Sequence, residues 1–426
     1  MNCKRLLQTF ALLSFLGVGL EVALAAPATP QVQNGANFWS GFRGPQGDGS
    51  VELPDLSGSS DQLELKEVWR HPLGPGYSAI AVSASALVTA FSDGKRDWLV
   101  ARRPETGSLL WKFDLGETYQ GHDGSMDGPL STPLVTPDLT YFLTPRGKVH
   151  GLETDTGKPV WERALPAASA PFYGFTASPL LAGPQLIIAG GKVGTSLWAL
   201  EPTTGKVIWQ DAEDTLHYQT PAFDSTSGEL LVLGDQFLRS LDLRTGQTLW
   251  RFPHGQSSPG YSQPLAWQQR IVVSSLDGLL AIKSQEVTEG RTAGGTRGPV
   301  SETWRNETVA RSYALPVALD DHLYTFSGSG LVALDVATGS ISWKSRAARG
   351  RGLIRVGSWL LFLNLLGELV AAEAKPEAYL EAARWPVLKV GSYVPPSFSE
   401  GRIFVRNNDE IAAFELTSKP LQGESP

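Results

Sequence analysis

Short apolar runs recur along the chain in pairs, and the same tight turn joins the two runs of each pair. In the clearest copy, an apolar run ending at Asp335 is followed by Thr338-Gly339 and then by Trp343 in a second run. Alternating apolar and polar positions over such short stretches predict β-strands rather than helices. The acidic side chain and the Thr can satisfy backbone donors in the turn, and Gly tolerates a positive φ. Each copy therefore predicts a β-hairpin with one large aromatic residue on its second strand.

The hairpin recurs along most of the chain, clearly in five copies and in degenerate form elsewhere. A tryptophan on the outer strand cannot be buried within its own sheet, so each unit needs a neighbour. We count eight such tryptophans: Trp69, Trp111, Trp161, Trp209, Trp250, Trp304, Trp343 and Trp385. The strand of Trp69 has no partner before it, and the run at 413–415 has no tryptophan strand after it. We expect these two halves to pair, so that an N-terminal strand closes the last unit.

These units predict an all-β fold, namely an eight-bladed β-propeller with tryptophan-docking repeats. Residues 65–416 allow about 44 residues per blade, within the ~40–50 that four-stranded blades use. A proline marks the entry to most units, as at Pro133, Pro179 and Pro221, and proline is tolerated at the first residue of a strand. The composition agrees, because 45 Gly, 29 Pro and 42% hydrophobic residues indicate a turn-rich chain with a large core.

Both ends of the chain differ from the repeat region. Residues 1–25 predict a signal peptide, because Lys4-Arg5 precede a short apolar stretch and small residues allow cleavage after Ala25. We therefore expect a periplasmic or secreted protein, and no other stretch is long enough for a transmembrane span. The single cysteine, Cys3, lies in the segment that is removed. Residues 26–64 are expected to form a tether and a leader segment, and residues 417–426 a polar tail.

The charge balance narrows the classes of partner. The whole chain carries −7, and removal of the signal peptide makes the mature chain more acidic by one charge. Nucleic-acid binding needs a basic footprint, so no nucleic-acid partner is predicted.

The pattern Ala-x-Asp-x-x-Thr-Gly-x-x-x-Trp, best kept from Ala333 to Trp343, resembles the pyrroloquinoline-quinone (PQQ) repeat. The resemblance covers nearly all of residues 65–416. Trp39–Gly49 is similar to the leader of secreted PQQ-like propellers of planctomycete-type bacteria. The PQQ-like family contains quinoprotein dehydrogenases as well as non-enzymatic propellers, such as the B subunit of the outer-membrane β-barrel assembly machinery.

The resemblance also implies what a dehydrogenase would need. Dehydrogenases of this fold usually carry an adjacent-cysteine disulfide, a calcium ion held by carboxylate and amide ligands, and a catalytic Asp. The mature chain has no cysteine, and no segment matches those calcium ligands or that Asp. We therefore predict no cofactor, and expect PQQ with calcium only if the chain is a dehydrogenase.

Two groups of residues are candidates for binding. Five tyrosines share one slot just before the innermost strand of a blade: Tyr77, Tyr218, Tyr261, Tyr313 and Tyr393. They could form an aromatic collar at the central channel that stacks on a planar or sugar-like ligand. The alternative is that each tyrosine wedges between adjacent blades. In the loop 121–128, Asp123 and Asp127 are weak metal candidates, because their spacing does not fit an EF-hand and a solvent-exposed turn explains them better.

The sequence contains no recognisable catalytic motif. It favours a non-catalytic, secreted or periplasmic propeller that acts as a monomeric scaffold. Its partner would be an envelope or extracellular protein, or a small planar or sugar-like ligand. One alternative is a PQQ-dependent oxidoreductase. Another is a propeller enzyme acting on polysaccharide, because such sites have no linear motif.

Overall fold

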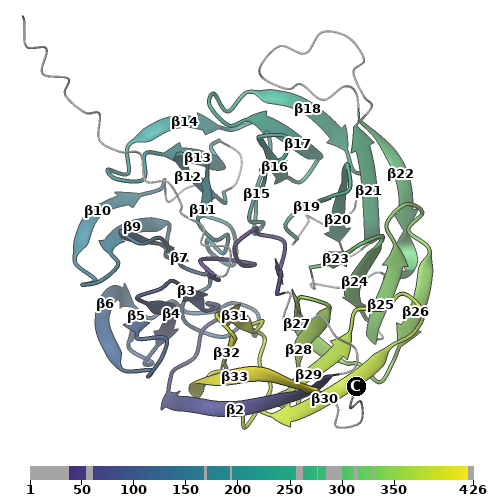
Figure 1. Ribbon diagram of the computed structural model, residues 1–426. Coiled ribbons are helices and arrows are strands. Elements are labelled where there is room, and N and C mark those ends of the chain that lie inside the picture. Colours follow the sequence, from purple (N-terminus) through teal and green to yellow (C-terminus); the bar gives the residue numbers. More distant parts are fainter. Residues whose placement is uncertain are drawn as a thin grey trace, which may run out of the picture. The chain divides into compact units, whose positions relative to one another are not determined.

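The computed structural model describes residues 38–53, 61–166, 170–191, 194–255, 262–275, 277–284, 300–309, 315–328 and 330–420. These residues form a ring of eight antiparallel blades, each a meander of four strands with its first strand nearest the centre (Figure 1). Within the described part of the chain, the one helical element is a 3-10 turn, Glu307–Val309. The predicted all-β, eight-bladed propeller is therefore confirmed. The predicted signal peptide lies outside the described residues.

The first four blades follow one another in chain order. The first holds β3 (Ala81–Val82), β4 (Leu87–Ser92), β5 (Arg96–Arg102) and β6 (Leu109–Glu117). The second holds β7 (Leu134–Val135), β8 (Leu139–Leu143), β9 (Lys148–Glu153) and β10 (Pro159–Ala164). The third holds β11 (Leu180–Ala182), β12 (Gln185–Ala189), β13 (Leu197–Leu200) and β14 (Val207–Asp211). The fourth holds β15 (Ala222–Asp224), β16 (Glu229–Leu233), β17 (Phe237–Asp242) and β18 (Thr248–Pro253).

The remaining blades complete the ring. The fifth holds β19 (Leu265–Trp267), β20 (Arg270–Ser275), β21 (Gly278–Ser284) and β22 (Val300–Asn306). The sixth holds β23 (Val317–Leu319), β24 (His322–Ser327), β25 (Gly330–Asp335) and β26 (Ile341–Ser345). The seventh holds β27 (Gly350–Val356), β28 (Trp359–Asn364), β29 (Glu368–Glu373) and β30 (Leu380–Pro386), and β1 (Ser50–Val51) pairs with β27. The eighth holds β31 (Ser397–Ser399), β32 (Arg402–Arg406), β33 (Glu410–Pro420) and β2 (Asp61–Pro72).

The N-terminal strand closes the eighth blade, as the unpaired halves predicted. β2 runs antiparallel to β33, and Trp69 lies opposite Ala413. The pair is longer than residues 65–416 would allow, because Asp61 pairs with Pro420. Residues 417–420, expected to begin a polar tail, are therefore strand. The closure joins the two ends of the repeat region, so the ring does not depend on blade-to-blade packing alone.

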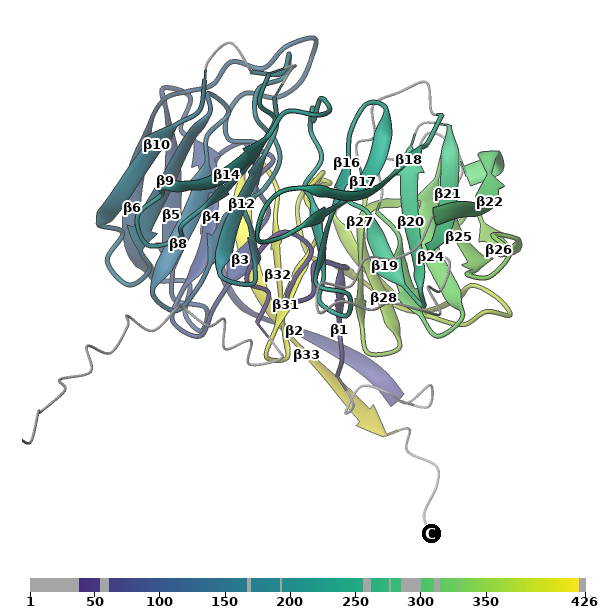
Figure 2. The same ribbon diagram turned by 90° about the horizontal axis from the view of Figure 1, so that it is seen from above.

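The antiparallel meander gives the ring two distinct faces. Connections between consecutive blades and turns between the second and third strands lie at one end of each sheet, which we call the connection face. Turns between the first and second strands, and the Thr-Gly turns between the third and fourth, lie at the other end, which we call the Thr-Gly face. Seen from the side, the blades stand next to one another around the ring, so one end of each blade lies on each face (Figure 2).

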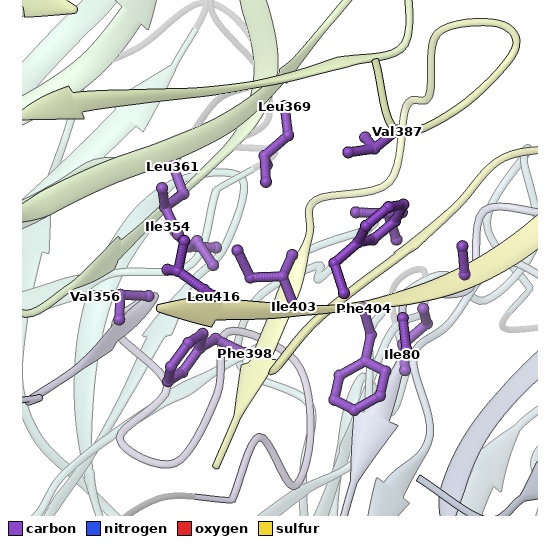
Figure 3. Packing of buried hydrophobic residues seen from close by; sticks show 14 of the residues in the cluster. Ile80, Ile354, Val356, Leu361, Leu369, Val387, Phe398, Ile403, Phe404 and Leu416 are labelled. Atoms are coloured by element: carbon purple, nitrogen blue, oxygen red, sulfur yellow. The ribbon is translucent and has the colours of Figure 1, made fainter. Parts of the chain in front are cut away.

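The hydrophobic core lies between blades rather than within them. One cluster joins Val88, Leu99 and Trp111 of the first blade to Phe142 and Leu152 of the second. Figure 3 shows the largest cluster, where side chains of the seventh blade meet those of β32 and β33. Each blade therefore buries its apolar faces only when both neighbours are present.

Candidate functional site

A tryptophan from one blade packs on the turn of the next. Trp111 is buried, and its indole Nε1 donates a hydrogen bond to the Thr154 carbonyl oxygen at 2.8 Å. A Cβ added to Gly157 would lie 2.5 Å from the Trp111 ring, and Gly157 has a φ of +68°, so this position requires glycine. Four further pairs repeat this contact: Trp69 with Gly107, Trp161 with Gly205, Trp209 with Gly246 and Trp304 with Gly339.

The other three predicted docking tryptophans lie where the repeat is degenerate or ends. Trp343 still reaches the next blade, where its Nε1 donates to the Lys375 carbonyl oxygen at 2.7 Å. Trp250 instead donates to Glu229 Oε2 of its own blade at 3.3 Å. Trp385 is partly buried and packs at the edge of the core cluster of the seventh and eighth blades. All eight lie on a blade's outermost strand, but only some meet a Thr-Gly turn.

The leader segment lies inside the ring rather than outside it (Figure 1). The carbonyl oxygens of Trp39 and Ser40 accept hydrogen bonds from Val82 N at 2.7 Å and Val135 N at 2.8 Å, at the ends of two innermost strands. From there the segment crosses to β27, with which β1 pairs in parallel. Trp39 is buried in the largest core cluster. Residues 38–51 therefore bridge the first two blades and the seventh across the centre.

Charged side chains of both signs lie at the ring centre, because Asp48, whose carboxylate accepts hydrogen bonds from Ser50, lies near the guanidinium of Arg43. The buried guanidinium of Arg43 donates to the carbonyl oxygens of Asp48 and Pro316, and burial lowers the pKa of Arg43 to about 10. Gln263 Nε2 donates to the Pro221 carbonyl oxygen at 2.8 Å, and a Cβ on Gly47 would lie 3.6 Å from this Nε2.

Calcium takes six to eight oxygen ligands, chiefly carboxylates. No group of three or more His, Cys, Asp or Glu in the described ranges could hold a metal ion. Of the weak metal candidates, Asp127 accepts a hydrogen bond from Gly121 N in its own loop at 2.8 Å, and Asp123 is exposed with a φ of +50°. The described residues therefore contain no acidic or histidine cluster of the kind that would hold calcium, and we derive no step through a quinone.

The structure brings two of the five slot tyrosines together. The rings of Tyr77 and Tyr393 meet edge to face at 6.2 Å, and Tyr77 Oη accepts a hydrogen bond from Met126 N at 3.1 Å. Tyr218 belongs to a different group, next to Tyr173 and His217. Tyr261 and Tyr313 lie outside the described residues. A complete five-tyrosine collar therefore stays a prediction.

A row of aromatic rings lies on the connection face, and the sequence did not predict it. It consists of six residues on three consecutive blade connections: Tyr119, His122, Phe172, Tyr173, Tyr218 and His217. Successive ring centroids in this order are 5.9, 5.3, 5.0, 5.8 and 5.6 Å apart. Phe172 is 56% exposed and Tyr173 is 36% exposed. One signal existed, because Phe172-Tyr173 is an aromatic pair directly after Pro171 in a connection rich in Ala, Pro and Ser.

Two groups hold the start of this aromatic row in place. Arg146 lies over the Tyr119 ring at 5.6 Å and donates to the Glu117 carbonyl oxygen at 2.7 Å. The buried carboxylate of Asp97 accepts a hydrogen bond from Tyr119 N at 3.0 Å through Oδ2, while its Oδ1 has no hydrogen-bond partner in the described part of the chain. Burial raises the pKa of Asp97 to about 6, against the opposing effects of the Tyr119 hydrogen bond and the Arg146 charge. Asp97 therefore fixes the connection that carries Tyr119.

The family model described as outer membrane protein assembly factor BamB, a PQQ-repeat model, matches residues 61–215 and 95–345. The chain belongs to this PQQ-like propeller family. The matched region contains the docking tryptophans from Trp69 to Trp343 and the whole aromatic row.

Individual relatives include both enzymes and an assembly factor. Quinoprotein alcohol dehydrogenase PedH of Pseudomonas putida is 28% identical over 203 residues, which are 45% of this chain and 32% of the relative. The structure of BamB from Moraxella catarrhalis matches with a TM-score of 0.58 at 19% identity, over 83% of this chain and 98% of that one.

A quinohemoprotein alcohol dehydrogenase from Comamonas testosteroni matches with a TM-score of 0.66 at 13% identity, over 90% of this chain and 81% of that one. At such identities the structural matches show the fold. The chain spans about a third of the length of PedH, so the activity of that relative does not transfer with the match.

Proposed function

We propose that this protein is a non-catalytic propeller of the bacterial envelope, which binds a partner protein through the aromatic row on its connection face. It would reach the envelope by the signal peptide predicted to be cleaved after Ala25. The observation that carries the proposal is the continuous contact of six aromatic rings across three blade connections, with Phe172 and Tyr173 exposed.

The physical properties of the row suit a protein partner. Aromatic side chains supply large contact area at a low cost in side-chain entropy, and they dominate the energetics of protein interfaces. The row is also fixed before binding, because Tyr218 Oη accepts a hydrogen bond from Tyr173 N at 3.4 Å and Arg146 covers Tyr119. A pre-ordered surface loses less entropy when a partner binds. The family match to an assembly factor also favours a binding role.

Quinone-dependent oxidation is the second candidate, and the identity with PedH favours it. It would need a calcium and quinone site, and the described residues contain no cluster of three or more His, Cys, Asp or Glu. Titration of the protein with PQQ and calcium separates the two candidates directly.

Photo-crosslinking from single positions tests the binding role. A benzoylphenylalanine in place of Phe172, on the connection face, should give an adduct of one defined mass with a protein in the envelope of the native organism. The same group in place of Ala337, an exposed residue in a Thr-Gly turn, is the matched control and should give no such adduct. Tyr173→Ala should weaken the Phe172 adduct roughly ten-fold, as expected when an aromatic anchor is lost.

This experiment tests both the protein partner and the face of the propeller that binds it. Equal adducts from Phe172 and Ala337 would contradict a specific role for the connection face. An adduct that Tyr173→Ala leaves at full yield would contradict the role of the aromatic row.

A further inference from the structure

Four large apolar side chains project from adjoining loops of the seventh and eighth blades. Leu365 and Leu366 occupy the turn between β28 and β29 and are 58% and 73% exposed. Val390 and Tyr393, on the connection from β30 to β31, are 50% and 58% exposed. Both segments belong to the connection face. We call these four residues the apolar tip.

Backbone packing holds the two parts of the apolar tip together. A Cβ added to Gly391 would lie 2.5 Å from the Leu365 carbonyl oxygen, and one added to Gly367 would lie 2.4 Å from the Leu388 carbonyl oxygen. The turn that bears the leucines therefore touches the connection that bears Val390. The tip is one pre-formed feature and not two independent loops.

Cationic side chains flank the apolar tip. Arg351 lies over the Tyr393 ring at 3.9 Å. Arg346 and Arg349 are exposed on the connection that leads into β27, and Lys389 is exposed beside Val390. No described residue forms an ion pair with Arg346, Arg349 or Arg351 within 4.0 Å. This concentration of positive charge lies in a chain whose net charge is −7.

The nearby acids are largely neutralised by other cations. Glu368 pairs with Arg384 at 2.9 Å, and Glu410 pairs with Arg70 at 2.7 Å. Asp409, in the turn between β32 and β33, is exposed. The apolar tip therefore has a cationic border that is available to an anionic partner.

We infer that the apolar tip and its cationic border dock the propeller on an anionic phospholipid surface. Leucine side chains at a turn enter the boundary between headgroups and acyl chains, tyrosine favours the same interface, and Arg and Lys attract lipid phosphates. Tyr and Arg also occur at protein interfaces, so the choice of a lipid surface rests on the two adjacent exposed leucines and Lys389, residue types that are rare among interface hot spots or depleted from interfaces. The apolar tip is a surface distinct from the aromatic row. Membrane docking can therefore be tested independently of the proposed function.

Flotation of the purified protein with lipid vesicles tests the inference. The protein should float with vesicles of phosphatidylcholine containing about 30% phosphatidylglycerol, and not with phosphatidylcholine alone, because binding requires the anionic headgroup. Raising the salt from about 0.1 M to about 1 M should release it, since the Debye length falls to about 3 Å. Leu365→Ser/Leu366→Ser should weaken binding about ten-fold or more. Arg346→Glu/Arg349→Glu should do the same through reversed charge.

A matched variant controls for loss of exposed apolar surface in general. Val207→Ser/Ile208→Ser removes two exposed aliphatic side chains from β14, on another blade, and should leave flotation unchanged. Equal melting temperatures of all variants show that folding is intact.

The inference is wrong if the wild-type protein stays unbound with anionic vesicles, or if the leucine variant floats as well as the wild type. It is also wrong if the leucine variant loses a crosslinked protein while no vesicle binding occurs, which would assign the tip to a protein partner.

Discussion

Trp111→Ala is expected to lower the free energy of unfolding by about 3–5 kcal/mol, the range for a large buried aromatic residue. The Trp111 ring belongs to the cluster that joins the first two blades, and its Nε1 satisfies the Thr154 carbonyl oxygen. Its removal leaves a cavity between blades and an unpaired buried acceptor. Urea unfolding followed by far-UV circular dichroism measures the change.

A double-mutant cycle shows whether the contact with the turn glycine is the cause. Gly157→Ala alone should also destabilise, because its Cβ would lie 2.5 Å from the Trp111 ring. In the Trp111→Ala background this clash disappears, so the cost of Gly157→Ala should fall to the strain of a positive φ. Phe172→Ala is the control, since this exposed ring should change stability by less than about 0.5 kcal/mol. Additive costs would contradict direct packing of ring on turn.

Asp97→Asn is expected to stabilise the protein increasingly as the pH rises from about 4 to about 7. Because burial raises the pKa of Asp97 to about 6, the folded state binds its proton more tightly than the unfolded state does. The contribution of this group to stability is therefore present at low pH and is lost as pH rises through the folded pKa. The gain above pH 7 is at most about 3 kcal/mol, at 1.36 kcal/mol per pKa unit.

The relevant measurement is the difference in unfolding free energy between the variant and the wild type at each pH, from urea titrations. Asp155→Asn, which removes an exposed carboxylate, is the matched control for the loss of one negative charge. A flat difference for Asp97→Asn would show that this carboxyl is not held in a costly charged state. If Asp97→Asn gains stability and the crosslink from position 172 is unchanged, the aromatic row does not need the negative charge of Asp97.

The fold could be predicted because its main contacts repeat at a fixed spacing. Each Thr-Gly turn and its tryptophan are encoded within one hairpin. The strand of Trp69 and the run at 413–415 each lacked a partner in the sequence, and this implied the closure by β2. The prediction ended the last blade early, because the alternation that identifies the repeat stops before the strand does. Residues 417–420 still pair with β2 although they carry no repeat residue.

The candidate site was less predictable because its contacts join connections that do not repeat. His122 and Phe172 lie on different connections, and their 5.3 Å ring contact depends on loop conformations that periodicity does not determine. Asp97 gave no signal, since one aspartate at the start of a strand is common. The leader was recognisable as a segment, but its hydrogen bonds to Val82 and Val135 depend on the assembled ring.

The central claim is that this propeller binds a partner without quinone chemistry, and titration of the purified mature protein with PQQ and calcium tests it most directly. The absorbance spectrum after desalting reports bound quinone, and reduction of a redox dye with alcohols and sugars reports turnover. A quinoprotein alcohol dehydrogenase from Pseudomonas putida, treated in parallel, is the positive control. We predict no retained quinone and no dye reduction by this protein. Stoichiometric quinone that survives desalting, together with substrate-dependent dye reduction, would contradict the account.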